Sequence, residues 1–125
     1  MLHLFLVFVG GGLGAAGRYL VGLAALRQFG PGFPYGTMLV NVAGSLAMGL
    51  LIGWLVRKGG SHEVRLFFAT GLLGGFTTFS AFSLDVANLW ERGAFAHALS
   101  YTMGTVVACI AAVFVGLWLV RTLSV

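Results

Sequence analysis

The stretch GLLGGFTTFSAFSLD, Gly71–Asp85, lies in an apolar segment of membrane length but contains residues that resist helix formation. Gly74 and Gly75 are followed by Thr77 and Thr78, and both glycine and β-branched residues disfavour helix. We therefore expect a helix that is broken near the middle of a membrane span. Backbone groups freed at that depth need protein or water as partners. Freed carbonyls suit an alkali cation, whereas freed amides and hydroxyls suit an anion.

The composition of the whole chain is that of an integral membrane protein. Of its 125 residues, 59% are hydrophobic and only 8% are charged, whereas about a quarter are charged in soluble domains. The net charge is +4, but the basic residues are scattered beside apolar runs. This distribution is not that of a nucleic-acid-binding surface, so we expect the partner to be a lipid bilayer and not nucleic acid.

Outward from the opening stretch, the chain divides into four apolar segments, each supplying the roughly 20 residues that a spanning helix needs. Their predicted ranges are Leu4–Leu26, Thr37–Val56, Val64–Leu89 and Phe95–Val120. Short polar or turn-forming pieces separate them. The sequence thus predicts an all-α membrane protein, with one four-helix transmembrane domain over residues 1–125 and both termini on the same side.

The first span contains GLGAAGR, Gly12–Arg18, which fits the G-x-G-x-x-G dinucleotide-binding motif. That motif also needs an acidic residue about 20 positions later, and the first acid here is Glu63. Small residues in membrane spans let helix backbones approach closely. Since Gly10, Gly14 and Arg18 share one helical face, packing is the favoured interpretation. Ser45, Gly49 and Gly53 form a similar face on the second span.

The basic residues give the chain only a weak preference for one orientation. By the positive-inside rule, the lysines and arginines in short loops set the topology. The two sides differ by only one or two such residues. This is compatible with insertion in both orientations and pairing of opposite copies, or with a single orientation.

Two polar residues of the first two spans are candidates for function, because polar groups are costly at membrane depth. Arg18 can extend its charged head to the interface or place a cation at the mouth of a water-filled cavity. Asn41, in LVNVAGS, can form an interhelical hydrogen bond or donate into a pore. The sequence leaves both alternatives open for each residue.

Phenylalanines recur every three residues after the predicted break, at Phe76, Phe79 and Phe82, and so form a stripe on one helical face. Such a stripe can be ordinary core packing. A phenyl ring also has a positive edge, and edges in a narrow path attract a small anion weakly enough to let it leave.

Hydroxyl groups accompany the phenylalanines. Thr78, Ser80 and Ser83 follow the break, and Tyr101, Thr105 and Cys109 share a face of the fourth span. The latter set can extend a hydroxyl track or serve as helix contacts.

Asp85 is the only acid we expect within a span, near its far end. A small multidrug exporter would need it to exchange protons for a cationic drug, so an exporter is the alternative function. A non-transporting assembly protein is a second alternative. No nucleophile–histidine–acid set or carboxylate pair is present, and we therefore expect no enzyme activity.

Three segments together identify a family: GGGLGAAGRY, GTMLVNVAGS and GGFTTFSAFS. The sequence resembles the Fluc (CrcB-type) fluoride channels of microbes over nearly its whole length. The resemblance implies a passive, fluoride-selective channel in the bacterial or archaeal plasma membrane that exports cytoplasmic fluoride and confers fluoride resistance. It also implies an antiparallel, dual-topology homodimer with two pores. Some relatives work instead as heterodimeric pairs.

The resemblance further implies which residues act. A structural sodium ion at the dimer centre would be held by the backbone carbonyls of Gly74 and Thr77, and Arg18 and Asp85 would lie at the pore vestibule. The pore positions fall on Asn41, Thr78, Phe79, Ser80, Phe82, Tyr101 and Thr105. The sequence departs from the family pattern at Ala81, where threonine is frequent, and at Cys109, where a hydroxyl residue can extend the polar track.

Overall fold

The structure is a computed structural model that describes residues 1–123. Within this part of the chain, four helical segments are long and apolar enough to cross a membrane. They cover Leu2–Phe29, Tyr35–Lys58, His62–Glu91 and Phe95–Leu123. The predicted number of four spans is confirmed. The first three extend beyond their predicted limits at both ends, whereas the fourth begins at the predicted Phe95 and extends only beyond its predicted end. The protein is therefore an all-helical, multi-pass membrane protein.

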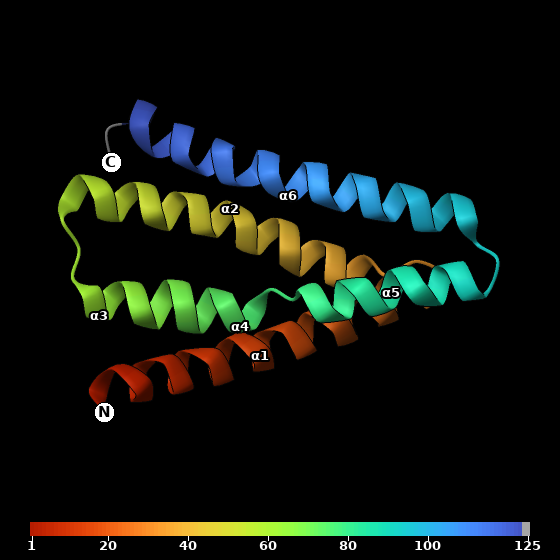
Figure 1. The fold of residues 1–125 in the computed structure, drawn as a ribbon, viewed down its shortest axis with the longest axis horizontal. Coiled ribbons are helices and arrows are strands. Elements are labelled where there is room, and N and C mark those ends of the chain that lie inside the picture. Colours follow the sequence, from red (N-terminus) through yellow and green to blue (C-terminus); the bar gives the residue numbers. More distant parts are fainter. Residues whose placement is uncertain (124–125) are drawn as a thin grey trace.

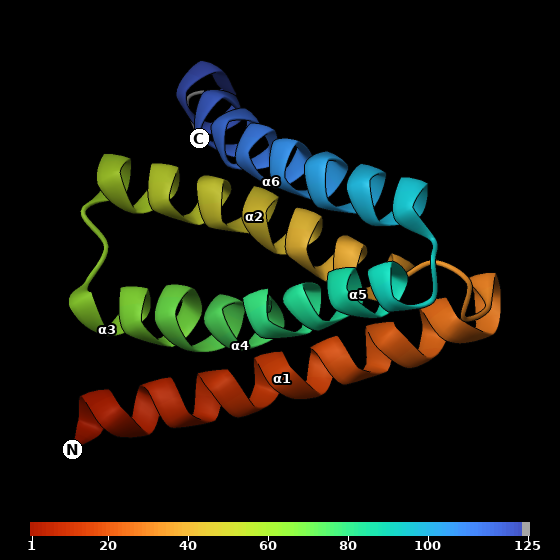
Figure 2. The same cartoon turned by 45° about the vertical axis from the view of Figure 1, so that its right-hand side comes forward.

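The third segment is composite, whereas the others are continuous. The elements are α1 (Leu2–Phe29), α2 (Tyr35–Lys58), α3 (His62–Arg65), the π-helix η1 (Leu66–Leu73), α4 (Gly74–Phe76), α5 (Phe79–Glu91) and α6 (Phe95–Leu123). Figure 1 shows α2 beside α6 in one layer, with α1 along the third span in the other, and the turned view in Figure 2 keeps these pairs. The N-terminus and the C-terminal end of α6 lie at the same end of the molecule.

The predicted break in the third span is confirmed, but it lies at the threonines and not at the glycines. Gly74 and Gly75 are helical, whereas Thr77 (φ −91°, ψ 160°) and Thr78 (φ −153°, ψ 126°) are extended. Extended backbone suits β-branched residues. The Thr77 hydroxyl also donates to the Leu73 carbonyl at 2.9 Å, at the point where the first helical half of the span ends.

Glycines bring α1 against the first half of the third span at backbone distance. A Cβ atom built on Gly10 would lie 2.6 Å from the Phe67 carbonyl oxygen, and one on Gly71 would lie 3.1 Å from the Gly10 Cα. Gly14 meets the Leu72 carbonyl more closely still. The packing interpretation of the glycine motif is confirmed, and the nucleotide alternative is excluded because the motif lies inside the continuous helix α1.

The second helix pair is joined in the same way. A Cβ on Gly116 of α6 would lie 2.6 Å from the Leu46 carbonyl oxygen, and Gly49 of α2 meets the Val113 carbonyl in return. A Cβ atom built on Gly53 would lie 3.1 Å from the Val120 Cβ. Backbone contact through small residues is the usual means by which helices associate in lipid.

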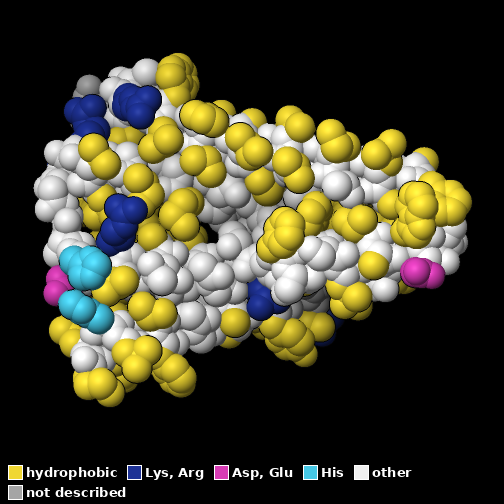
Figure 3. Space-filling view, viewed as in Figure 1, with side chains coloured by type: hydrophobic (Ala, Val, Ile, Leu, Met, Phe, Trp, Pro, Cys, Tyr) yellow, Lys and Arg dark blue, Asp and Glu magenta, His cyan; other side chains and the backbone are white. Residues whose placement is uncertain are grey.

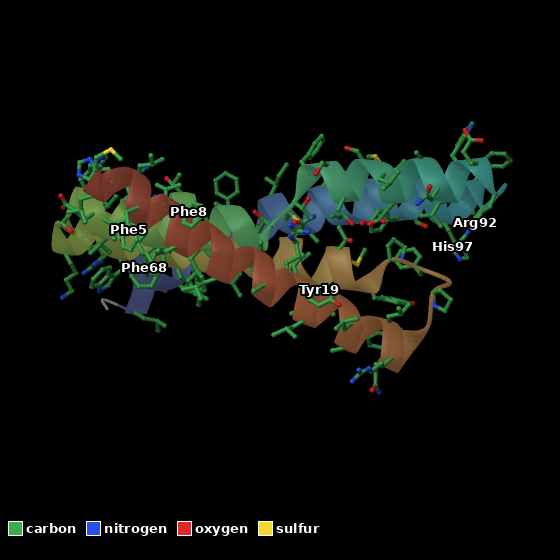
Figure 4. All side chains as sticks on the ribbon, turned by 90° about the horizontal axis from the view of Figure 1, so that it is seen from below. Phe5, Phe8, Tyr19, Phe68, Arg92 and His97 are labelled. Carbon is green, nitrogen blue, oxygen red and sulfur yellow. The ribbon has the colours of Figure 1, made fainter. Side chains whose placement is uncertain are left out.

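The surface is apolar along the length of the helices, as Figure 3 shows for one face, and lysine and arginine gather mainly at the end that holds the termini. Phe5 and Phe8 of α1 and Phe68 of η1 project outward near that end, whereas Arg92 and His97 lie at the other (Figure 4). Such an exposed apolar surface suits contact with lipid or with another apolar helix face.

Candidate functional site

Asn41 of α2 holds the break in the third span from the side. Its Nδ2 donates to the Thr78 carbonyl at 3.0 Å, and its Oδ1 accepts from the Thr78 amide at 2.8 Å. The side chain thus satisfies both backbone groups of a residue that lies outside any helix. Of the two alternatives for Asn41, the hydrogen bond to another span is observed. The residue also lines the central cavity, the one of about 360 Å³ described below.

Backbone carbonyls of Gly74–Thr77 lose their helical donors at the break. In a continuous helix the Thr78 amide would donate to Gly74, but it donates to Asn41. The Ala81 amide would likewise donate to Thr77, but it donates to the Thr78 hydroxyl, the N-cap of α5, at 3.1 Å. Gly74 and Thr77, the residues that the family resemblance pairs with sodium, are thus among the residues whose carbonyls lose a helical donor.

Arg18 reaches the same region from α1. Its Nε donates to the Gly75 carbonyl at 3.2 Å. The side chain also lines a cavity of about 290 Å³ together with Thr37 and Thr78. The arginine is therefore hydrogen-bonded to the break and borders a cavity, and its role at a cavity mouth stays a prediction.

A cavity of about 360 Å³ opens beside the break between α2, α5 and α6. It brings together five of the predicted pore residues from three helices. These residues are Asn41, Thr78, Phe79, Phe82 and Thr105. Cys109 lines the same cavity, so the fourth-helix face is shared by a hydroxyl and a thiol.

The phenylalanine stripe is interrupted by the break. Phe79 and Phe82 lie on α5 with ring centroids 5.7 Å apart. Phe76 precedes the extended residues and packs its ring beside Gly17 of α1, so the prediction of one stripe through all three residues is wrong. Phe79 is 78% exposed on the single chain, whereas Phe82 is 6% exposed and packs on Tyr101.

Tyr101 and Ser80 do not line the 360 Å³ cavity. Tyr101 is fully buried and donates its hydroxyl to Asp85 Oδ2 at 3.0 Å. Ser80 is exposed, and its hydroxyl lies 3.4 Å from that of Thr78. By contrast, the Thr105 hydroxyl is buried and has no hydrogen-bond partner among residues 1–123.

Asp85 and Arg18 belong to separate cavities. Asp85 lines a cavity of about 290 Å³ together with Pro31 and Pro34, which belong to the connection between α1 and α2. Arg18 lines the cavity described above. Thr37 lines both cavities.

Comparison with known proteins identifies the family of this chain. The family described as CrcB-like protein, Camphor Resistance (CrcB), matches residues 5–117. The chain belongs to the CrcB family. Similar proteins of Mesorhizobium japonicum and Chelativorans sp. are each 59% identical to it, over 98% of this chain and 99% of their own length. A protein of Methylobacterium nodulans is 57% identical over 97% of this chain and 98% of its own length. Each is named "Fluoride-specific ion channel FluC".

The family resemblance seen in the sequence is thus confirmed. The relatives of this CrcB-family chain are named as ion channels, which are not enzymes, and their names give no support to a multidrug exporter. They come from bacteria, which agrees with a bacterial multi-pass membrane protein.

Sequence reasoning missed other residues of the cavity wall. Gly44, Ser45 and Met48 of α2 line the cavity beside Asn41. A Cβ atom on Gly44 would collide with the Thr77 methyl group. The absence of a side chain at Gly44 therefore leaves room for the extended residue Thr77. The spacing of three residues between Asn41 and Gly44 is the signal that could have identified this glycine.

Proposed function

We propose that this chain is a passive fluoride-selective channel that exports cytoplasmic fluoride through the plasma membrane of a bacterium and so confers fluoride resistance. The observation that carries the proposal is the 360 Å³ cavity at the broken third span, which joins an amide, hydroxyls and phenyl rings at membrane depth. We infer that the ion is fluoride from the names of the similar proteins.

The chemistry of the cavity wall suits a small, strongly hydrated anion. Fluoride that enters must exchange water for other donors. Thr105 offers a buried hydroxyl with no other partner among the described residues, and Asn41 has a second amide hydrogen beyond the one given to Thr78. The exposed ring of Phe79 adds a weakly positive edge. Donors of this modest strength replace hydration and still release the ion.

The channel works, in this proposal, as an antiparallel homodimer with two pores. The open side of the cavity and the exposed Phe79 provide an apolar surface for a second copy in the opposite orientation. The weak charge bias between the two sides makes both orientations accessible.

A structural sodium ion at the dimer centre is part of the same proposal. Gly74 and Thr77 would hold it through their freed carbonyls, two from each copy. A bound sodium supplies a fixed positive charge between the two chains. Within one chain, a Cβ on Gly74 would meet only the Ala69 carbonyl oxygen, at an ordinary 3.6 Å. The glycine is therefore not required by contacts inside the chain, which is expected if a second copy or an ion approaches it.

The remaining residues have supporting roles. Thr78 would present its hydroxyl beside the path while capping α5, with Ser80 next to it. Tyr101 would act indirectly, by fixing Asp85 near the vestibule that Arg18 approaches from α1.

Release of fluoride from liposomes tests the proposal. Purified protein is reconstituted into vesicles loaded with fluoride, and matched vesicles are loaded with chloride; release is followed with ion-selective electrodes. We expect rapid fluoride release with chloride retained, and no release from protein-free vesicles. Folded, dimeric protein that releases neither ion would contradict the proposal and favour an assembly role or a missing partner chain.

A further inference from the structure

The α6 wall of the central cavity carries a thiol that the proposed conduction chemistry does not use. Cys109 is the only cysteine in the chain and is partly exposed. It lies one helical turn after Thr105, and both residues line the 360 Å³ cavity. Residues four apart are neighbours on a helix surface, so the two side chains border the same cavity.

Thr105 gives an independent indication that this part of the cavity receives a small molecule. Its side chain is only 3% exposed, and its hydroxyl has no hydrogen-bond partner among the described residues. Buried hydroxyls are nearly always paired with protein or with a bound molecule. The wall around Thr105 therefore faces a space that a guest can enter, and Cys109 borders that space.

We infer that Cys109 is a modification site inside the conduction cavity, open to small neutral thiol-reactive electrophiles, and that its modification stops ion flow. The effect on flow rests on the proposed function, whereas access to the thiol does not. The site would make this channel sensitive to thiol reagents.

The cavity has the size and polarity for a neutral aromatic reagent. Met48, Ile110 and Val113 give its wall an apolar part. A dry cavity of about 150 Å³ is enough to bind benzene, and this one measures about 360 Å³. A benzyl group therefore fits beside α6, where it fills space next to Asn41 and Thr78.

The reaction with benzyl methanethiosulfonate is a thiol exchange. The Cys109 thiol gives its proton to water, and the thiolate is the nucleophile. Its Sγ attacks the benzyl-bearing sulfur, a new S–S bond forms, and the bond between that sulfur and the sulfonyl group breaks. Methanesulfinate leaves with the electron pair, so the reagent is the oxidant. A dithiol reductant reverses the modification.

The test uses the reconstituted protein in fluoride-loaded liposomes. We expect benzyl methanethiosulfonate to add one benzylthio group to the native chain, detected by intact-mass spectrometry, and to lower fluoride release to the rate of protein-free vesicles. A dithiol should restore both the mass and the release. The Cys109→Ser variant should conduct, keep its mass and ignore the reagent.

A second variant separates block from mere labelling. Lys58 lies at the exposed end of α2, outside the apolar part of the span, and does not line the cavity. In the Cys109→Ser background, Lys58→Cys should be labelled and should still release fluoride at the unmodified rate.

Two outcomes would overturn the inference. The first is complete labelling of Cys109 with unchanged fluoride release; the second is an unlabelled Cys109 under conditions that label Lys58→Cys. A native protein that releases no fluoride before the reagent is added overturns the proposed function and the predicted block, and the labelling comparison then decides access alone.

Discussion

The third span is built in opposite ways on the two sides of Thr77 and Thr78. Before the break, its backbone touches α1 directly through glycines, with hardly any side chain between them. After the break, α5 packs through side chains, and Phe82 and Leu89 meet Ala98 and Tyr101 of α6 in the main buried cluster. Backbone packing tolerates no added atoms, so the first half is a fixed support, while the second half carries the groups that face the cavity.

The Asn41 contact at the junction is where we expect the largest effect on stability. Asn41→Leu removes both partners of the Thr78 backbone, and each unpaired buried group costs about 1–3 kcal/mol. We expect a strong loss in the free energy of unfolding, measured by thermal unfolding in detergent, together with loss of fluoride release. Asn41→Asp keeps an acceptor for the amide and should be intermediate. Native stability of Asn41→Leu would show that the break holds itself open.

We expect the second largest effect on stability at the glycine contacts between α1 and the first half of the third span. Gly14→Ala places a methyl group against the Leu72 carbonyl and 2.7 Å from the Phe76 amide nitrogen. Overpacking of this kind costs about 1–3 kcal/mol. Gly12→Ala is the matched control, because nothing lies within 4 Å of its added Cβ. We expect unfolding temperature and dimer yield to fall for Gly14→Ala only; equal behaviour of the two variants would remove the distinction between the halves of the span.

The cap of α5 should have a smaller effect. Thr78→Val removes the hydroxyl that accepts from the Ala81 amide, and loss of such a cap costs about 1 kcal/mol. Thr78→Ser keeps the hydroxyl and should retain most of the stability. If serine and valine were equally harmful in the unfolding assay, the β-branched shape of residue 78, and not its capping hydroxyl, would hold the break.

An exposed contact at the end of the molecule should have the least effect. His3 Nε2 lies 3.3 Å from Glu63 Oε1, and both side chains are about half exposed. Since solvent screens such pairs, we expect His3→Ala to leave the unfolding temperature within error at neutral pH. A shift as large as that of Gly14→Ala would mean that the first half of the third span depends on its end and not on its glycines.

The sequence predicted those features that depend on residue type over a short stretch. Apolar length predicted the four spans, and weak helix formers predicted the break. Its position at Thr77 and Thr78 required knowledge of partners far along the chain, because Asn41 captures the Thr78 amide from 37 residues away. The same limit applies to Tyr101, whose hydroxyl was predicted to line the pore but is bonded to Asp85.

Spacing alone was misleading where the helix is interrupted. Phe76, Phe79 and Phe82 share a face only in a continuous helix, and the extended residues between Phe76 and Phe79 turn the first ring toward α1. Five of the predicted pore residues nevertheless line one cavity, and the family resemblance identified them without relying on helical periodicity.

Fluoride release by Phe79→Ile and Phe82→Ile, measured beside the native protein, tests the central claim that the cavity after the break is the conduction path. Phe8→Ile is the control, since Phe8 projects outward from α1 (Figure 4) and does not line the cavity. We predict that Phe79→Ile and Phe82→Ile each assemble as dimers but release fluoride far more slowly, because isoleucine offers no polarised ring edge, while Phe8→Ile is unaffected. Native release rates in both cavity variants would contradict the account.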